Sequence, residues 1–254
     1  SLALDPDMRA CRDEKLVTSF LFREVEKAMR SAYGDGMSLP LELQLEAARE
    51  RLRQAASAHI GELKEGWEIV AAETAVKGML DGVMITGRID RVERNTRTGL
   101  MRILDYKTAD SGVMPDKEHL GTFRDGMPEY MRTPGVGNGR DRAWSDLQLP
   151  LYAAFYERAE PGALPEIGYF NLPRSADEAG IRIWNGFDRV RMESALECAR
   201  GVIADLRGRH FWPPRSRAPG GVDNPMAHLY IGSPETCFDG LALERLAGRA
   251  GGAA

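Results

Sequence analysis

Two amphipathic helices are predicted at the start of the chain. From Cys11 to about Tyr33, apolar residues recur at spacings of three to five, the pattern of a helix that buries one stripe. Gly34 and Gly36 then end this pattern. A second helix is predicted from Pro40, with Glu and Arg around one apolar face, and that face contains Leu41, Leu45, Ala48, Leu52, Ala55 and Ala56.

From Trp67 the pattern changes to that of strands. Three segments are rich in β-branched and apolar residues, namely Trp67 to Gly78, Val83 to Glu93 and Leu100 to Lys107. The connectors between them, 81–82 and 95–99, are short and contain turn-forming residues. We therefore expect an antiparallel meander of three strands.

The second half of the chain predicts fewer and shorter elements. Residues 110–141 contain many Gly, Pro and charged residues and are interpreted as a long loop. A helix is expected over 145–157, strands over 167–172 and 181–184, and an amphipathic helix over 188–207. This order predicts an α/β fold, in which a small mixed sheet led by the meander has helices on both sides.

The composition is that of an ordinary globular protein. The chain has 254 residues, 43% of them hydrophobic and 28% charged, so it can bury a large core without covalent cross-links. At ~150 residues per domain, this length corresponds to roughly 1.7 domains. We distinguish an N-terminal helical region at 1–66, a core at 67–210 and an irregular extension at 211–254, and expect one compact domain.

No targeting or membrane segment is recognised in the sequence. No run approaches the ~18 apolar residues of a membrane helix, and the N-terminus lacks a signal-peptide pattern, so a cytoplasmic protein without a membrane partner is expected. The chain begins with Ser1, which suggests processing or a piece of a longer polypeptide. Cys11, Cys198 and Cys237 are widely separated, so neither a disulfide framework nor a zinc site is indicated.

Charge alone identifies no partner. The formal net charge is −4, which does not indicate nucleic acid. Two groups of arginines could follow a phosphate backbone or form a solvated face: Arg88, Arg91, Arg94, Arg97 and Arg102 in the hairpin, and Arg207, Arg209, Arg215 and Arg217 near the end. Phe211 and Trp212 could stack bases, whereas core packing is favoured for Trp144.

The first candidate for chemistry lies at the end of the third predicted strand. Alternation puts Met101, Ile103, Asp105 and Lys107 on one face, so a carboxylate and an ammonium project side by side. Charged pairs at strand ends are common, and this one could be a plain salt bridge.

The neighbouring strand adds a second carboxylate. A hairpin that returns through residues 95–99 pairs Asp90 with a residue between Ile103 and Asp105. Two close carboxylates repel each other unless a cation lies between them, and Mg²⁺ or Mn²⁺ prefers such oxygen ligands while keeping waters and room for a phosphate. Lys107 would lie at the edge of that site, where it could hold a water or offset charge on a phosphodiester.

Three motifs together resemble a known family. They are Gly87-Arg-Ile-Asp90-Arg, Ile103-Leu-Asp105-Tyr106-Lys107-Thr108 and Gln148-Leu-Pro-Leu-Tyr152. In order and spacing they resemble the RecB-like branch of the PD-(D/E)xK nucleases, especially the C-terminal nuclease domain of AddB-type helicase–nuclease subunits. The resemblance spans about residues 67–172, with a weaker match at 211–213, and makes 67–210 the expected nuclease core. It implies a restriction-endonuclease-like fold, a central mixed sheet flanked by helices.

The resemblance also implies roles for individual residues. Asp90 and Asp105 would be metal ligands, the carbonyl of Tyr106 would complete the inner shell, and Lys107 would be the catalytic lysine. The metal would be Mg²⁺ or Mn²⁺.

Gln148 and Tyr152 match the family's Q-x-x-x-Y motif. Positions i and i+4 share a helix face, so both side chains could meet the site or a DNA strand, although Tyr152 could equally pack a helix on the sheet. Pro150 fits only in a first helical turn, so this helix should start near Leu147 or Gln148. Glu73 is a candidate for orienting waters or Lys107, or for a salt bridge to Arg88 or Lys77.

Two family features are missing. Many RecB-like nucleases carry a ligating histidine on an N-terminal helix, and the comparable stretch at 20–26 has none. Glu24 or Glu26 could substitute, and His59 is interpreted as a surface or packing residue. AddB-type domains often hold an iron–sulfur cluster on four cysteines, but only Cys237 lies in the later region, so no cluster is expected.

The sequence therefore predicts a Mg²⁺-dependent deoxyribonuclease that acts on duplex ends or single strands in recombination and double-strand break repair. Its partners would be DNA and a helicase subunit or a helicase-like domain of the same longer chain. The alternative is a catalytically inactive nuclease-fold domain with a DNA-binding or scaffolding role, which the absent histidine motivates.

Overall fold

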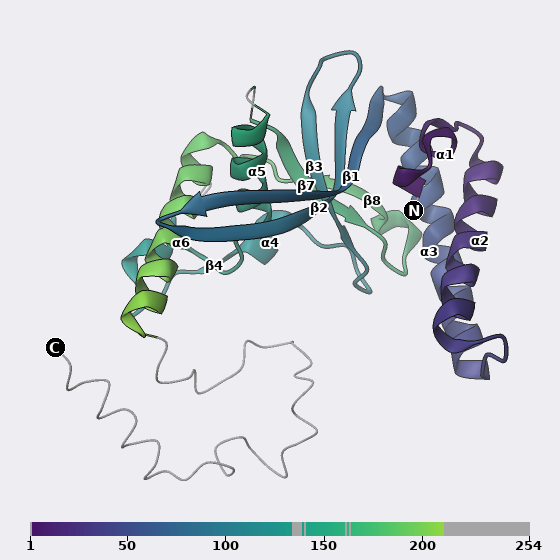
Figure 1. Cartoon of the computed structure of the whole chain (residues 1–254), viewed down its shortest axis with the longest axis horizontal. Helices are drawn as coiled ribbons and strands as arrows, with labels where there is room; N and C mark the ends of the chain where they lie inside the picture. The colour runs from purple at the N-terminus through teal and green to yellow at the C-terminus, as the bar shows by residue number, and fades with distance from the viewer. Residues whose placement is uncertain (1, 134–138, 140, 161, 163, 211–254) are drawn as a thin grey trace, which may run out of the picture. The chain divides into compact units, whose positions relative to one another are not determined.

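The computed structural model describes residues 2–133, 139, 141–160, 162 and 164–210 (Figure 1). The chain divides into two units, Ser1–Gly201 and Val202–Ala254. The first unit contains the sheets and all the candidate site residues. In the second, the described part is the end of helix α6 (Arg189–Gly208) and the two residues after it.

The N-terminal region is helical, as expected. A short 3₁₀ turn and helix α1 (Pro6–Ala10) precede the two long helices α2 (Glu14–Tyr33) and α3 (Leu39–Lys64). Helix α2 begins where the carboxylate of Asp13 accepts hydrogen bonds from two free N–H groups of the first turn. It ends at Gly34, whose φ of 83° only glycine adopts readily.

Within the described residues, five strands form a mixed sheet in the order β1-β2-β3-β7-β8. They are β1 (Trp67–Leu80), β2 (Val83–Asn95), β3 (Met101–Lys107), β7 (Glu166–Asn171) and β8 (Gly180–Ile183). Strands β1, β2 and β3 form the predicted antiparallel meander, β7 pairs parallel with β3, and β8 pairs antiparallel with β7. The predicted mixed α/β fold is confirmed.

Helices cover both faces of this sheet. Helix α5 (Gln148–Ala159) packs on the face that carries Ile103 and Ile167, both fully buried. On the opposite face, His59 of α3 contacts Arg91 of β2. Alternation along β3 therefore decides which residues point toward α5 and which toward α3.

The predicted long loop over 110–141 is wrong where the structure describes it. This region contains α4 (Pro115–His119) and a second sheet of strands β4 (Leu120–Thr122), β5 (Arg132–Thr133) and β6 (Arg142–Trp144), ordered β4-β6-β5. Strands of two or three residues are too short to show a hydrophobic period, so sequence patterns miss them.

Some sequence-based expectations fall outside the described residues, including those for Phe211, Trp212, Arg215, Arg217 and Cys237.

In the described part of the chain, every helix is too short or too polar to cross a lipid bilayer. Trp144 is buried in the main core, as its interpretation as a packing residue requires.

Candidate active site

The two predicted carboxylates come together at the end of the meander. The ladder between β2 and β3 ends with the pair Arg91 and Leu104, which leaves Asp90 opposite Asp105, as the hairpin count predicts. Oδ2 of Asp90 accepts a hydrogen bond of 2.9 Å from the backbone N–H of Tyr106. The backbone that follows Asp105 is therefore within reach of the Asp90 carboxylate.

Lys107 lies against the same carboxylate pair. Its Nζ atom is 2.9 Å from Oδ2 of Asp105, whose side chain is only 9% exposed. The lysine side chain is 28% exposed, and its ammonium lies 4.6 Å from the centre of the Tyr169 ring. Lys107 can therefore meet a solvent-borne group without leaving Asp105.

Helix α5 adds an amide and a phenol to this cluster. Nε2 of Gln148 donates a hydrogen bond of 2.9 Å to Oδ1 of Asp105, and lies 3.4 Å from the hydroxyl of Tyr152. The N–H of Arg88 on β2 donates to the same hydroxyl at 3.4 Å. The helix starts at Gln148 with Pro150 in its first turn, as predicted. Gln148 and Tyr152 thus share one helix face, which points at the site.

A glycine in the first motif makes room for the phenol. A Cβ atom on Gly87 would lie 2.4 Å from Cε1 of Tyr152, closer than any real contact. The side chain of Tyr152 therefore lies directly on the backbone of β2 at this residue. This contact explains why the motif contains glycine there.

Glu73 stands on β1, beside the position of Asp90 on β2. Its neighbours Ala72 and Thr74 pair with Arg91 and Ile89. Oε2 of Glu73 lies 3.5 Å from Nη1 of Arg88, the salt bridge that was one of its expected alternatives, and both side chains are exposed. Its φ of 50° is unusual for a residue other than glycine in a strand, and such strain clusters at functional sites.

The electrostatics of the cluster favour a cation. Burial raises the pKa of Asp90, the negative charges of Asp105 and Glu73 raise it further, and the Tyr106 N–H and Lys107 act in the opposite direction. A hard divalent cation would relieve this repulsion, and carboxylate and carbonyl oxygens suit it. Asp90, Asp105 and the carbonyl of Tyr106 therefore fit such an ion by the chemistry of their donors. Among the described residues, no three His, Cys, Asp or Glu side chains gather closely enough to form a metal site alone.

Two buried side chains that the sequence did not single out adjoin this cluster. Tyr169 neighbours Asp105 in the parallel ladder of β3 and β7, and its hydroxyl lies 2.9 Å from Nε2 of His119. His119 is fully buried at the end of α4, whereas the sequence suggested a loop residue. Strand alternation could have indicated Tyr169, but nothing in the local sequence indicated His119.

His59 and several arginines serve the opposite face of the sheet. His59 is buried between the Arg9 carbonyl and Arg91, at 3.0 Å from each, and so is a packing residue. Arg91 and Arg102 are buried around Glu93, so neither is available to follow a phosphate backbone. Glu26 of α2 is held by Arg30 and Arg49.

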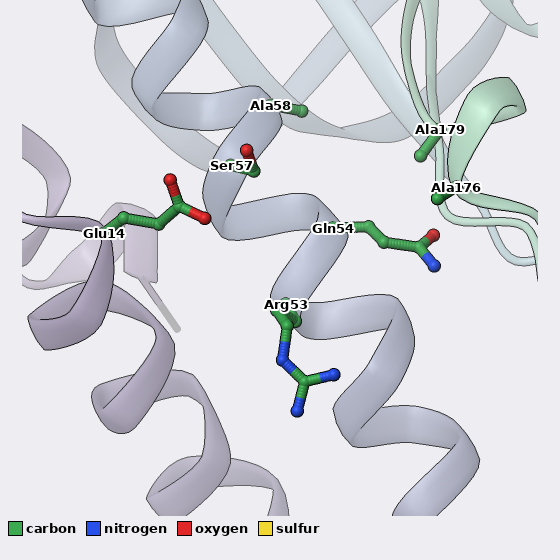
Figure 2. Close-up of a pocket in the computed structure, with 7 residues that line it drawn as sticks. All are labelled: Glu14, Arg53, Gln54, Ser57, Ala58, Ala176 and Ala179. Atoms are coloured by element: carbon green, nitrogen blue, oxygen red, sulfur yellow. The ribbon is translucent and has the colours of Figure 1, made fainter.

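The hollow shown in Figure 2 is separate from this chemistry. Glu14 of α2 lies on one side, residues of α3 form the middle, and Ala176 and Ala179 lie on the other side. None of the predicted site residues lines it; the lining residues are Glu14, Arg53, Gln54, Ser57, Ala58, Ala176 and Ala179. The candidate site is therefore the open cluster around Asp105, not this hollow.

The fold and the cluster define a class of protein: a mixed α/β sheet in which two central strands bring two aspartates and a lysine together. The family model described as "PD-(D/E)XK nuclease superfamily" matches residues 7–218. This chain belongs to the PD-(D/E)XK nuclease superfamily.

Other comparisons give more distant likenesses. The crystal structure of the "Putative exonuclease" from Eubacterium rectale has a TM-score of 0.43 and 16% identity, and the match covers 87% of this chain and 80% of that one. The crystal structure of SSO0001 has a TM-score of 0.26 and 15% identity, with 74% and 86% covered. No curated protein matches the chain.

Proposed function

We propose that this chain is a metal-dependent deoxyribonuclease of the RecB-like branch, similar to the nuclease domain of AddB-type subunits. It hydrolyses DNA phosphodiesters at duplex ends or in single strands, in the cytoplasm, during recombination and double-strand break repair. Its partners are DNA and a helicase subunit or a helicase-like domain of the same longer chain. Membership of the superfamily supports the reaction class, and the three motifs support the branch.

One observation carries the proposal. Asp90, Asp105 and Lys107 lie in one hydrogen-bonded cluster with Gln148 and Tyr152, although they come from β2, β3 and α5. A structural salt bridge between Asp105 and Lys107 would need neither the second carboxylate nor the amide. Bringing a raised-pKa carboxylate beside this pair costs stability, and such costs are typical of functional sites.

The mechanism assigns a task to each of these residues. Asp90, Asp105 and the Tyr106 carbonyl would hold Mg²⁺ or Mn²⁺, which supplies Lewis-acid activation of water and phosphate. Lys107, fixed by Asp105, presents its ammonium to the phosphate and offsets the negative charge that grows during attack. Gln148 holds the other oxygen of Asp105, and Tyr152 holds Gln148 against β2. Glu73 orients water beside Asp90.

The full chain, incubated with labelled single-stranded and duplex DNA and Mg²⁺ or Mn²⁺, tests the activity directly. We expect cleavage that Asp105→Asn and Lys107→Ala each reduce by at least about 100-fold, the scale on which loss of electrostatic stabilisation acts. Asp177→Asn removes an exposed carboxylate far from this cluster in sequence and should cleave like the wild type. Equal cleavage by all three variants would refute the assignment.

The inactive alternative remains a distinct hypothesis. A DNA-binding or scaffolding domain that retains the nuclease fold would need no metal, and the lack of a histidine in the helical stretch at 20–26 motivates it. Calorimetric titration with Mn²⁺ separates the two. A nuclease should bind Mn²⁺ in a manner that Asp90→Asn and Asp105→Asn abolish, whereas an inactive domain should bind DNA without it.

We also propose that residues 1–66 and the nuclease core at 67–210 form one compact domain; the extension expected at 211–254 lies outside the described residues. Support comes from α3, where Arg51 donates hydrogen bonds to the carbonyls of Thr108 and Leu172 beyond the ends of β3 and β7. Limited proteolysis tests it: cleavage between 1–66 and 67–210 should be absent in the native protein. Release of a stable core lacking residues 1–66 would contradict a single domain.

A further inference from the structure

Lys107 belongs to a closed cycle of contacts at the candidate site. Lys107 contacts Asp105, Asp105 accepts a hydrogen bond from Gln148, and the backbone N–H of Gln148 donates to Oδ1 of Asp146 at 2.7 Å. The cycle of contacts continues behind the site. The carbonyl of Asp146 lies 2.8 Å from Nδ1 of His119, Nε2 of His119 lies 2.9 Å from the Tyr169 hydroxyl, and the Tyr169 ring faces Lys107.

The partners of His119 decide where its proton lies. A carbonyl oxygen only accepts, so Nδ1 must carry the proton that is donated to Asp146. Burial lowers the pKa of His119, so the ring is neutral and Nε2 is an acceptor. The Tyr169 hydroxyl therefore donates to Nε2, and burial also raises the pKa of Tyr169. Both nitrogens of His119 therefore have a hydrogen-bond partner. The bond from the Tyr169 hydroxyl to His119 holds the Tyr169 ring in one orientation.

We propose that Tyr169 and His119 are positioning residues for Lys107: the Tyr169 ring holds the lysine ammonium beside Asp105, and His119 anchors that ring through its hydroxyl. The inference rests on the proposed nuclease function, because it assigns these residues to the same site. A cation over an aromatic face is attracted by the ring quadrupole, most strongly where water is scarce. Tyr169 is fully buried, so its ring is a fixed surface against which Lys107 has one preferred place.

A purely structural role would not require this pairing. His119 already packs through its ring on Trp184, with ring centres 5.1 Å apart. What packing leaves unexplained is that Asp146 contributes to both sides of this cycle: its carbonyl holds His119, and its carboxylate accepts the backbone N–H of Gln148, the first residue of α5. The amide and the lysine on either side of Asp105 are thereby tied to one residue.

Two substitutions that remove the hydrogen bond between Tyr169 and His119 test the anchor. Tyr169→Phe keeps the ring and removes the hydroxyl, and His119→Asn keeps a donor for Asp146 but cannot reach Tyr169. We expect each variant to lower kcat about tenfold at saturating DNA and metal, with KM little changed, because the lysine is displaced by a fraction of an ångström. The double variant should be no slower than either single variant, since both break the same bond. His119→Gln, whose amide oxygen reaches the place of Nε2, should recover most of the loss.

A larger change and a matched control complete the set. Tyr169→Leu removes the ring and should approach the kcat of Lys107→Ala. His59→Asn removes an equally buried histidine on the other face of the sheet and should keep kcat when rates are expressed per folded molecule. Wild-type kcat in Tyr169→Leu, or additive losses in the double variant, would overturn the inference.

A spectroscopic measurement separates this inference from the nuclease assignment. Protons beside the Lys107 ammonium lie over the Tyr169 ring, so their resonances should be shifted upfield in the full chain labelled with ¹³C-lysine. Lys107→Arg identifies the signal, and Tyr169→Leu should return it to the usual position. A normal Lys107 signal in the folded wild type would refute the positioning even if the chain cleaves DNA. An upfield signal in a chain without activity would refute the nuclease proposal alone.

Discussion

Oδ2 of Asp90 accepts a hydrogen bond of 2.9 Å from the backbone N–H of Tyr106, the residue that follows Asp105. This bond joins β2 to β3 beyond their last ladder pair. It brings Asp90 and Asp105 together beside Lys107. Burial raises the pKa of Asp90, and the charges of Asp105 and Glu73 add to the effect. The proposed chemistry needs Asp90 to be ionised, and keeping this carboxylate ionised lowers the stability of the fold.

Asp90→Asn should separate stability from function. The amide oxygen can still accept the Tyr106 N–H, while the half-buried charge and its repulsion from Asp105 are removed. We expect the melting temperature in metal-free buffer to equal or exceed that of the wild type, and cleavage to fall by at least about 100-fold. Thermal melts with a chelator, combined with the DNA assay, measure both. A variant that melts well below the wild type would show that the carboxylate stabilises the fold instead.

Gly87→Ala should disturb the site through packing. The added methyl group would collide with the Tyr152 ring at 2.4 Å, so the ring or strand β2 must move, at a cost of about 1–3 kcal/mol. Gly61→Ala is the matched control, because nothing lies within 4 Å of the new methyl group and alanine stabilises a helix interior by about 0.5–1 kcal/mol. Urea unfolding should show opposite signs for the two variants. Adding Tyr152→Leu to Gly87→Ala should recover stability. If stability is not recovered, the clash does not involve the Tyr152 ring.

The meander and its register could be predicted because strong local signals agree. Three β-branched segments with short turns between them leave one simple topology. Counting across residues 95–99 places the partner of Asp90 between Ile103 and Asp105, and the observed register puts it at Asp105. Pro150 likewise fixes the start of α5, since proline is tolerated only in the first turn of a helix. Each of these features depends on residues close in sequence.

The rest depends on contacts between distant segments, which carry no local signal. Strands β4, β5 and β6 exist because their backbones pair with one another, and the side chain of Arg142 donates to the Gly121 carbonyl across that sheet. His119 meets Tyr169 from 50 positions away, and the φ of Glu73 is a local geometry that no pattern reveals. The sequence suggested that Arg91 and Arg102 lie on the surface. In the structure both are buried around Glu93.

Glu93→Gln should be among the most damaging substitutions. Glu93 is fully buried and accepts hydrogen bonds from Arg91 and Arg102, which hold its pKa below the usual range against the effect of burial. The neutral amide would leave the buried Arg91 guanidinium without its counter-charge and Arg102 with Glu62 alone, at a cost of about 3–5 kcal/mol. Chemical denaturation measures the loss. Glu50→Gln, which breaks the exposed pair with Arg53, should change stability by less than about 0.5 kcal/mol, and comparable losses in both variants would contradict the role of burial.

The last prediction concerns pH and uses the buried histidine on the α3 side. Burial, together with the nearby Arg91, lowers the pKa of His59 from 6.5 to about 4, while the Arg9 carbonyl acts in the opposite direction. Between these two values the unfolded chain binds a proton that the folded chain does not, so folding stability rises with pH across this window. The contribution is fully present above pH ~6.5 and is lost as the pH falls toward ~4, by as much as about 3 kcal/mol.

His59→Asn should flatten this part of the pH dependence. The amide oxygen can still accept from Arg91, but the side chain no longer titrates. At pH ~7.5 the variant should be less stable than the wild type, and the difference should shrink as the pH is lowered toward ~4, because only the wild type loses the histidine contribution. Urea midpoints at several pH values measure this, provided the dependence on urea stays constant. Because His119 is retained in both proteins, its own titration cancels in the comparison, and parallel curves for the two proteins would mean that His59 ionises as freely in the folded state as in the unfolded one.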